Sequence, residues 1–177
     1  MSVTALAMAD SPAATLPVLL LRVAGQTLAI GQQAIAEILP LPRLAPLPEA
    51  PPILTGSFSL GDTTVFVLPL GGLLGLSGPA EGTALYHHLL LLPAQPGEVR
   101  LALSVDRVTD MVRAEALPRP AGASFNGCVE AEIRHEGEAV PLLSLHHLLT
   151  GYERERLQAF TARESSRAAI FRPAEPS

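Results

Sequence analysis

Residues 53–76 read ILTGSFSLGDTTVFVLPLGGLLGL, and the predicted architecture rests on this stretch. Over residues 54–60, Leu, Gly and Phe alternate with Thr and Ser, which is the period of a strand with one buried face. Gly61 and Asp62 then predict a tight turn, because Gly reaches positive φ freely and Asp bonds its own backbone. Residues 63–70 are apolar at nearly every position, so we expect them to return antiparallel as a central strand covered on both faces.

This apolar hairpin requires neighbours. Gly71 and Gly72 end its second strand, and Leu73, Leu74 and Leu76 predict a short helical turn at one end of the sheet. Two strands alone are marginally stable in water, so the flanking segments must close around them.

The composition favours many short strands. The chain of 177 residues suits one domain or two small barrels, and its 17 Pro and 14 Gly favour strands and turns over long helices. Alternation and turn signals place the further strands at residues 18–25, 27–30, 83–92, 99–105, 108–114, 128–134 and 139–143. In residues 99–105, we expect Val and Leu to face inward and Arg100, Ala102 and Ser104 to face outward.

The connections are also predictable. Residues 31–39 predict a turn of helix followed by a strand, and residues 40–52, with six prolines, predict an extended crossover in polyproline-like conformation. A helix is expected from its N-cap Ser144 to Gly151, packing through three leucines. A second helix is expected over residues 152–171, with a weak apolar stripe of Leu157, Phe160, Ala168 and Phe171.

Charge and cysteine content restrict the function. The formal net charge is −5 and all 12 basic residues are Arg, so we see no concentrated basic surface for nucleic acid. The single cysteine, Cys128, excludes an internal disulfide and fits a reducing compartment. No apolar run is long enough to cross a bilayer, and residues 1–10 lack the basic start of a signal peptide. We therefore expect a soluble, cytoplasmic protein.

Catalytic and metal chemistry find little support in the sequence. Nothing near Cys128 nominates an activating base, so we interpret it as a small semi-buried hydrophobe. The pairs His87-His88 and His146-His147 do not predict a metal site, because adjacent residues of a strand point to opposite faces. Asp106 lacks a second group for acid/base work, and we expect it to satisfy backbone donors at a kink. We therefore predict no catalytic, cofactor or metal site.

The chain resembles the CheW family of chemotaxis scaffold proteins over residues 17–150. The family's V-x-E-I element is matched by Ile35–Ile38, its Pro-rich crossover by Pro48–Pro52, and its V-D-x-V element by Val105–Val108. The family stretch G-V-x-N-L-R-G-x-x-x-P-V-x-D-L-x-x-x-L-G-L corresponds without a gap to GSFSLGDTTVFVLPLGGLLGL. The closing L-L-D-L-x-x-L-L element corresponds to residues 142–149.

Several residues that are typical of the family are replaced in this chain. Gly61 stands where the family has Arg, Pro69 where it has Asp, and Phe66 where it has Pro. The apolar framework is retained, and a framework specifies fold more strongly than it specifies partner.

The resemblance implies a mainly β fold of two SH3-like five-stranded β-barrels with short helices and a C-terminal helix. It implies a CheW-like domain over residues 17–150, and the small and polar residues before it predict a flexible tail over residues 1–16. Within this domain, one barrel would come mainly from residues 32–80 and the other from 81–142, with a helix and tail over 151–177.

The resemblance also implies a function and sites. It implies a non-catalytic adaptor between methyl-accepting chemoreceptors and a CheA-type histidine kinase, reaching membranes only through receptor arrays. Ile35, Glu37 and Ile38 would face the receptor. Val105, Asp106 and Val108 would form the seam between barrels or the kinase interface, and Gly56 and Gly61 would be turn residues.

Two alternatives stay open. The departures at Gly61 and Pro69 favour a divergent regulator of a type IV pilus or another motility circuit that has lost receptor coupling. A small-molecule sensor would require a sizeable apolar pocket between the barrels.

Overall fold

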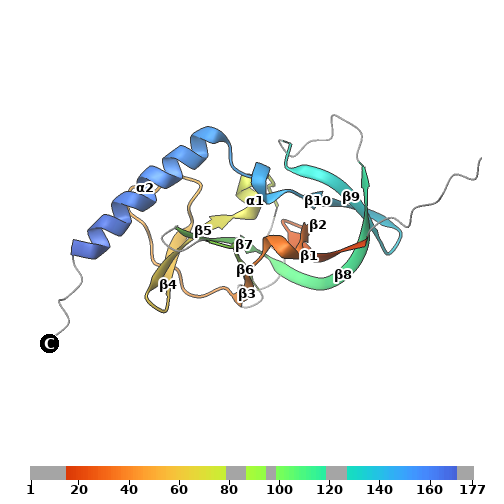
Figure 1. The fold of residues 1–177 in the computed structure, drawn as a ribbon, viewed down its shortest axis with the longest axis horizontal. Coiled ribbons are helices and arrows are strands. Elements are labelled where there is room, and N and C mark those ends of the chain that lie inside the picture. The colour runs from red at the N-terminus through yellow and green to blue at the C-terminus, as the bar shows by residue number, and fades with distance from the viewer. Residues whose placement is uncertain (1–14, 79–86, 95–98, 119–126, 171–177) are drawn as a thin grey trace, which may run out of the picture.

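The structure, a computed structural model, describes residues 15–78, 87–94, 99–118 and 127–170. These residues form two five-stranded units that pack side by side (Figure 1). The first unit is a closed barrel with strand order β1-β2-β10-β9-β8, and the second is a sheet with order β3-β6-β7-β5-β4. The predicted mainly β, CheW-like fold is confirmed.

The barrel is built from both ends of the described chain. Its strands are β1 (Thr15–Val23), β2 (Gln26–Gly31), β8 (Arg107–Pro118), β9 (Val129–His135) and β10 (Glu138–Leu143). Antiparallel pairs make up most of the barrel, and β10 runs parallel to β2 with Leu142 opposite Ala29. This parallel pair closes the barrel and removes its free edges.

The second sheet takes the middle of the chain. Its strands are β3 (Glu37–Pro40), β4 (Gly56–Leu60), β5 (Thr63–Pro69), β6 (His88–Leu91) and β7 (Arg100–Val105). The β4–β5 hairpin is present, and β5 pairs with β7 in parallel. The Pro-rich crossover leaves β3 and reaches β4, where the Ala45 N–H donates to the Ser57 carbonyl at 2.7 Å. The crossover therefore connects the two edge strands of this sheet.

Two short helices follow strands within the chain, η1 (Gln32–Ala34) and α1 (Leu70–Leu73). After the last strand come the short η3 (Leu145–His147) and the long C-terminal helix α2 (Gly151–Ile170). The turn of helix followed by a strand at residues 31–39 is confirmed. The helical turn after β5 begins at Leu70, three residues before the expected Leu73.

Three apolar clusters make up the core of the described chain. One fills the barrel, one lies inside the second sheet, and a central cluster lies between them and continues under α2. Strand β5 contributes to two of them, with Val65 and Val67 inside the sheet and Phe66 and Leu68 in the central cluster. This confirms that β5 is covered on both faces.

The division of strands between the units differs from the expected one. We expected residues 32–80 in one barrel and 81–142 in the other, whereas β6 and β7 pair with the strands of the first half. Strands β1 and β2 correspondingly join β8–β10. Because β7 lies inside the second sheet, Ala102 is fully buried against the interior cluster, and the expectation that it faces outward is wrong.

The boundaries near the chain ends also differ. Strand β1 begins at Thr15, so the expected tail of residues 1–16 is shorter by at least two residues, and residues 1–14 lie outside the described ones. Part of the expected strand 83–92 also lies outside them.

The expected helix from Ser144 to Gly151 is a short η3 instead, and Gly151 begins α2. Ser144 is at the N-cap position of η3 but makes no side-chain capping bond. Thr150 and Glu153 cap α2: the Glu153 N–H donates to Thr150 Oγ1 at 3.2 Å, and the Thr150 N–H donates to Glu153 Oε2 at 2.9 Å. This reciprocal pair is a capping box and starts a new helix at Gly151.

Candidate functional site

The edge strand β3 exposes an apolar side chain beside a carboxylate. Ile38 lies opposite Leu90 of β6, whose side chain belongs to the central cluster. Directly paired residues share a face of a sheet, so Ile38 lies on the face that packs toward the barrel. At the edge it stays 39% exposed, and Glu37 beside it is exposed as well.

The barrel strand β8 contributes a second exposed apolar side chain. Met111 lies opposite Leu19 of β1 and is 56% exposed. Its neighbours Val112 and Ala114 face the barrel interior, so Met111 occupies the outer face of β8. Ile38 and Met111 are the large hydrophobic side chains that the described part of the chain exposes.

Both side chains line one hollow between the two units, which we call the Ile38–Met111 hollow. Its volume is about 240 Å³. It is lined by Leu19, Gln32, Ile35, Ala36, Glu37, Ile38 and Met111. Exposed apolar side chains gathered in a hollow with a polar rim are typical of a protein-binding surface.

Backbone hydrogen bonds fix the wall of this hollow. The Ile35 N–H donates to the Gln32 carbonyl at 3.1 Å, and the Ala36 N–H donates to the Leu91 carbonyl at 2.8 Å. The half-buried Ile35 packs against the central cluster. The wall is therefore anchored in the core, and a partner would meet a preformed surface.

The structure brings the three predicted receptor-facing residues together. Ile35, Glu37 and Ile38 all line the hollow. Sequence analysis missed Met111 and Leu19. The signal at Met111 was available, because it is an apolar residue on the face of β8 that otherwise carries Arg113 and Glu115.

The predicted seam residues lie where the chain passes from the sheet into the barrel. Val105 is buried in the central cluster, and Val108 packs against it. Asp106 Oδ2 accepts a hydrogen bond from the Ala24 N–H at 2.7 Å. The interpretation that Asp106 satisfies a backbone donor is confirmed. The Val108 N–H donates to His88 Nδ1 at 3.3 Å, which ties β8 to β6.

The two predicted turn glycines have different roles. Gly61 lies in the turn between β4 and β5 with φ +58°. Gly56 is the first residue of β4 instead of a turn residue. A Cβ atom at Gly56 would lie 2.8 Å from the Ala45 carbonyl oxygen. The missing side chain at Gly56 therefore lets the crossover approach β4.

The thiol of Cys128 and the potential metal ligands lie in surroundings that are typical of residues with a structural role. The Cys128 thiol is buried and donates to the His147 carbonyl at 3.1 Å. Burial, and to a lesser extent the charge of Glu153, raises the pKa of Cys128 above its ordinary value of 9.0. A reactive cysteine requires the opposite shift. Among the described residues, no group of three or more His, Cys, Asp and Glu side chains could hold a metal ion.

A second hollow, of about 310 Å³, lies at the junction of the two units. Its lining mixes apolar groups such as Val23 and Leu76 with the polar Thr55, Ser104 and Asp106. Its volume is at the lower limit of small-molecule pockets, which is roughly 300 Å³. Over the described residues, no helix has both the length and the apolar character of a membrane span.

Comparisons with known proteins agree with this architecture. The described fold is similar to the crystal structure of scaffolding protein TtCheW from Thermoanaerobacter tengcongensis, with a TM-score of 0.67 and 15% sequence identity. The similarity covers 77% of this chain and 89% of that chain. A comparison with curated proteins finds no match. Residues 17–152 match the family described as CheW-like domain. The chain belongs to the CheW-like domain family.

Proposed function

We propose that the protein is a non-catalytic, cytoplasmic adaptor that couples a methyl-accepting chemoreceptor to a CheA-type histidine kinase. Membership of the CheW-like domain family supports a scaffold role. The observation that carries the proposal is the Ile38–Met111 hollow, where the two exposed large hydrophobic side chains of the described chain come together.

The chemistry of the hollow indicates the kind of receptor segment that it binds. Apolar side chains in a groove suit the apolar face of a helix, and Glu37 at the rim adds a carboxylate. The partner would be a receptor helix that places a basic side chain beside large apolar ones. In this proposal, Ile35, Glu37 and Ile38 are the residues that face the receptor helix.

The seam supports the transmission of the signal. The hollow joins β3 of the sheet to β8 of the barrel, and Val105, Asp106 and Val108 connect the same two units. A receptor helix with different contacts in its two signalling states would bias how the units present their surfaces to the kinase. The contacts of these three residues support an inter-unit role for them.

A co-precipitation experiment tests the proposal. The tagged chain is mixed with the chemoreceptor signalling domain and the histidine kinase of the same organism. The wild-type chain is expected to capture both, and Met111→Asp is expected to lose the receptor and retain the kinase, because it places a charge in the apolar hollow.

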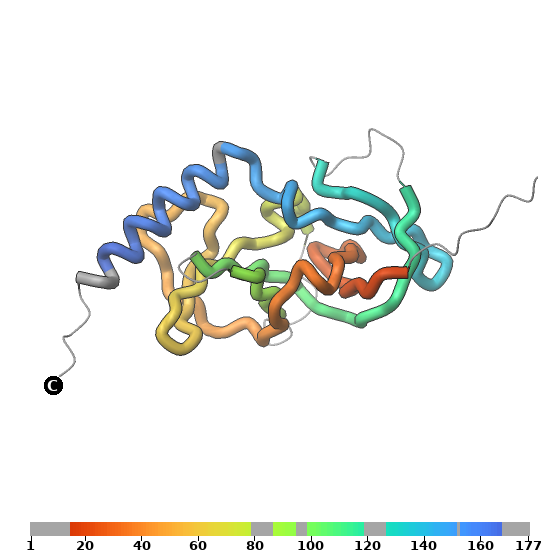
Figure 2. Tube along the Cα trace, viewed as in Figure 1, coloured from red at the N-terminus to blue at the C-terminus, as the bar shows by residue number. Residues whose placement is uncertain are grey.

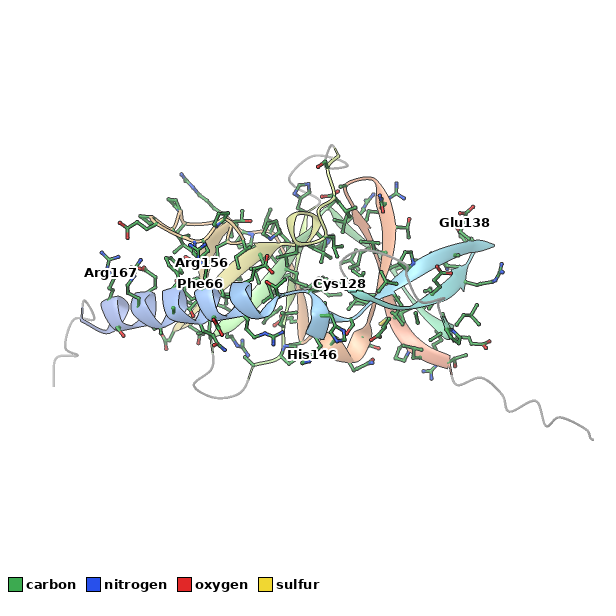
Figure 3. The ribbon with its side chains drawn as sticks, turned by 90° about the horizontal axis from the view of Figure 1, so that it is seen from above. Phe66, Cys128, Glu138, His146, Arg156 and Arg167 are labelled. Carbon is green, nitrogen blue, oxygen red and sulfur yellow. The ribbon has the colours of Figure 1, made fainter. Side chains whose placement is uncertain are left out.

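Ala139→Asp is the matched control. It adds the same charge to the exposed side of β10, in the β9–β10 hairpin, whose Glu138 lies at the far end of the barrel (Figure 3). This variant is expected to retain both partners. If the wild-type chain captures neither partner under conditions where a typical family member captures both, the coupling proposal is wrong.

A second candidate is a regulator of a type IV pilus or another motility circuit on the same fold. Gly61 and Pro69, which stand where the family has Arg and Asp, favour it. In the same experiment this candidate predicts capture of a kinase or another signalling protein without the chemoreceptor, and no effect of Met111→Asp on that capture.

A further inference from the structure

The C-terminal helix α2 lies along the second sheet and away from the barrel (Figure 1). Leu157, Phe160 and Thr161 are the buried residues on the part of α2 whose side chains are described. Their spacing of i, i+3 and i+4 puts them on one face of the helix. The ring of Phe160 meets the ring of Phe66 of β5 edge-on, with centroids 6.4 Å apart. Figure 3 shows Phe66 beside α2.

The apolar surface of the sheet that α2 covers, which we call its seat, is not fully buried. An open hollow of about 440 Å³ lies beside α2. It is lined by Val99 and Leu101 at the sheet, by Leu149 before the helix, and by Arg154, Leu157, Gln158 and Thr161 of α2. Val99 and Leu101 are only half-buried, so α2 leaves part of this apolar surface uncovered.

Exposed polar side chains also connect α2 to the rest of the chain. The Arg154 guanidinium donates to the His146 carbonyl at 3.1 Å, near the start of the helix. The Thr161 hydroxyl donates to the Leu157 carbonyl of the same helix at 2.8 Å. Arg163 pairs with Glu49 of the crossover at 3.3 Å, and both side chains are more than half exposed. Exposed ion pairs stabilise weakly. Leu157 and Phe160 supply the buried apolar part of the attachment.

The Arg163–Glu49 ion pair nevertheless makes one end of the seat polar. Figure 2 shows the crossover, in orange, running beside α2. Arg163 reaches Glu49 there and also lies 5.8 Å from the centroid of the Phe160 ring. A helix in this seat thus meets apolar surface at the position of Leu157 and a carboxylate six residues later, roughly one and two-thirds turns along the helix.

Departure of α2 would take Leu157 and Phe160 out of the central cluster but would leave the segment before the helix anchored. Leu148 is buried in the central cluster, whereas Thr150 and Gly151 are exposed. A Cβ atom at Gly151 would meet nothing within 4 Å. Leu148 can therefore stay anchored while the chain pivots after it.

We propose that the surface formed by Phe66, Val99 and Leu101 is a helix-binding site that α2 occupies within its own chain. Its external partner is an amphipathic helix of another protein that carries large apolar residues three positions apart and a basic residue six positions after the first. These are the features by which Leu157, Phe160 and Arg163 fit the seat. The site is separate from the Ile38–Met111 hollow, so this inference does not rest on the proposed function.

The tether explains why the site is normally closed. A segment held by a short linker competes at an effective concentration in the millimolar range. An external helix must therefore bind more tightly than α2, or α2 must be weakened. Binding would release α2 and replace it by the same kind of contact.

The test uses full-length variants and a fluorescent peptide with the sequence of residues 150–170. Leu157→Asp combined with Phe160→Asp removes the apolar face of α2. Ala159→Asp combined with Ala162→Asp adds the same charges at exposed positions of the same helix and is the matched control. Fluorescence anisotropy measures peptide binding, and hydrogen exchange measures the protection of α2.

In the Leu157/Phe160 variant, α2 amides are expected to exchange faster. The peptide is expected to bind this variant at least about tenfold more tightly than it binds the wild-type chain or the control variant. Adding Leu101→Ala is expected to weaken peptide binding again. Leu157→Ala, which introduces no charge, is expected to give an intermediate affinity and remains informative if the double variant does not fold.

Three results would overturn the proposal. Unchanged exchange of α2 in both Leu157 variants would show that other contacts hold the helix. Equal peptide affinity for wild-type and folded variant chains would show that α2 does not cover the site. A wild-type dimer that exchanges α2 between two copies would identify the occupant as a second copy of this chain.

Discussion

The carboxylate of Asp106 lies 2.7 Å from the backbone nitrogen of Ala24 and accepts its hydrogen bond across 82 residues of sequence. Ala24 has φ +49° in the tight turn between β1 and β2. The Asp106 N–H in turn donates to the Arg22 carbonyl at 3.1 Å. The β7–β8 junction is therefore fastened to a turn of the barrel at the point where the two units meet.

Removing this carboxylate should loosen the seam. Asp106→Ala is expected to lower the free energy of unfolding by about 2 kcal/mol, because it removes a charged acceptor and leaves the Ala24 N–H without it. Asp106→Asn keeps an acceptor and should cost less. Urea unfolding with an unchanged m value measures the difference. Equal stability of the Ala variant and the wild-type chain would contradict this role.

The glycine that begins β4 and the glycine in the turn after it provide a second prediction. Gly56→Ala places a Cβ atom 2.8 Å from the Ala45 carbonyl oxygen and 3.0 Å from Leu44 Cβ. A Cβ atom at Gly61 meets nothing within 4 Å, so only its φ of +58° is unfavourable. We expect Gly61→Ala to cost about 1 kcal/mol, Gly61→Asn less, and Gly56→Ala more than either. Thermal or urea unfolding of the three variants gives the order, and an inverted order would contradict the close approach at Gly56.

The same hairpin shows what sequence periodicity can predict. The run TTVFVLPL predicted a central strand because apolar residues occur on both of its faces, and β5 has this position. The failure at Ala102 has the same physical basis. Alternation with Arg100 and Ser104 suggested an outer face, but a small residue between two polar ones is also compatible with a buried strand.

The pairing of distant strands could not be predicted in this way. Periodicity identifies strands but does not say which strand lies beside which. The β5–β7 pair and the β10–β2 pair are both parallel and join strands that are distant in sequence. The first pair brings β7 into the unit formed by earlier strands, and the second brings β2 into the unit formed by later strands. The residues of the Ile38–Met111 hollow were predicted only on the β3 side, since the contribution of β8 depends on this pairing.

The start of α2 could have been predicted from the spacing of Thr150 and Glu153. Thr150→Ala is expected to cost about 1 kcal/mol of local helix stability, because it removes the oxygen that accepts from the Glu153 N–H. Thr150→Ser keeps that oxygen and serves as the control. Hydrogen exchange in the first turn of α2 should be faster in the Ala variant only. Equal protection in both variants would show that the capping box does not stabilise the start of the helix.

The buried thiol predicts a dependence of stability on alkaline pH. Its pKa in the folded chain is raised above 9.0 by burial and, secondarily, by Glu153. Above about pH 9 the unfolded chain therefore loses the thiol proton while the folded chain keeps it. The folded state then binds more protons, so the free energy of unfolding must fall as the pH rises from about 9 toward the folded pKa.

Cys128→Ala removes this contribution, and the stability of the wild-type chain relative to it should be constant below pH 9 and decrease above it. One proton limits the slope to about 1.4 kcal/mol per pH unit. Glu153→Gln keeps an acceptor for Thr150 but removes the second cause of the shift, so its decrease should be smaller. Urea unfolding of the three chains between roughly pH 7 and pH 10 measures these differences, because this range brackets the ordinary pKa of a cysteine thiol. A wild-type chain that tracks Cys128→Ala across the whole range would mean that the thiol ionises equally well in the folded and unfolded states, and that the packing around His147 admits water.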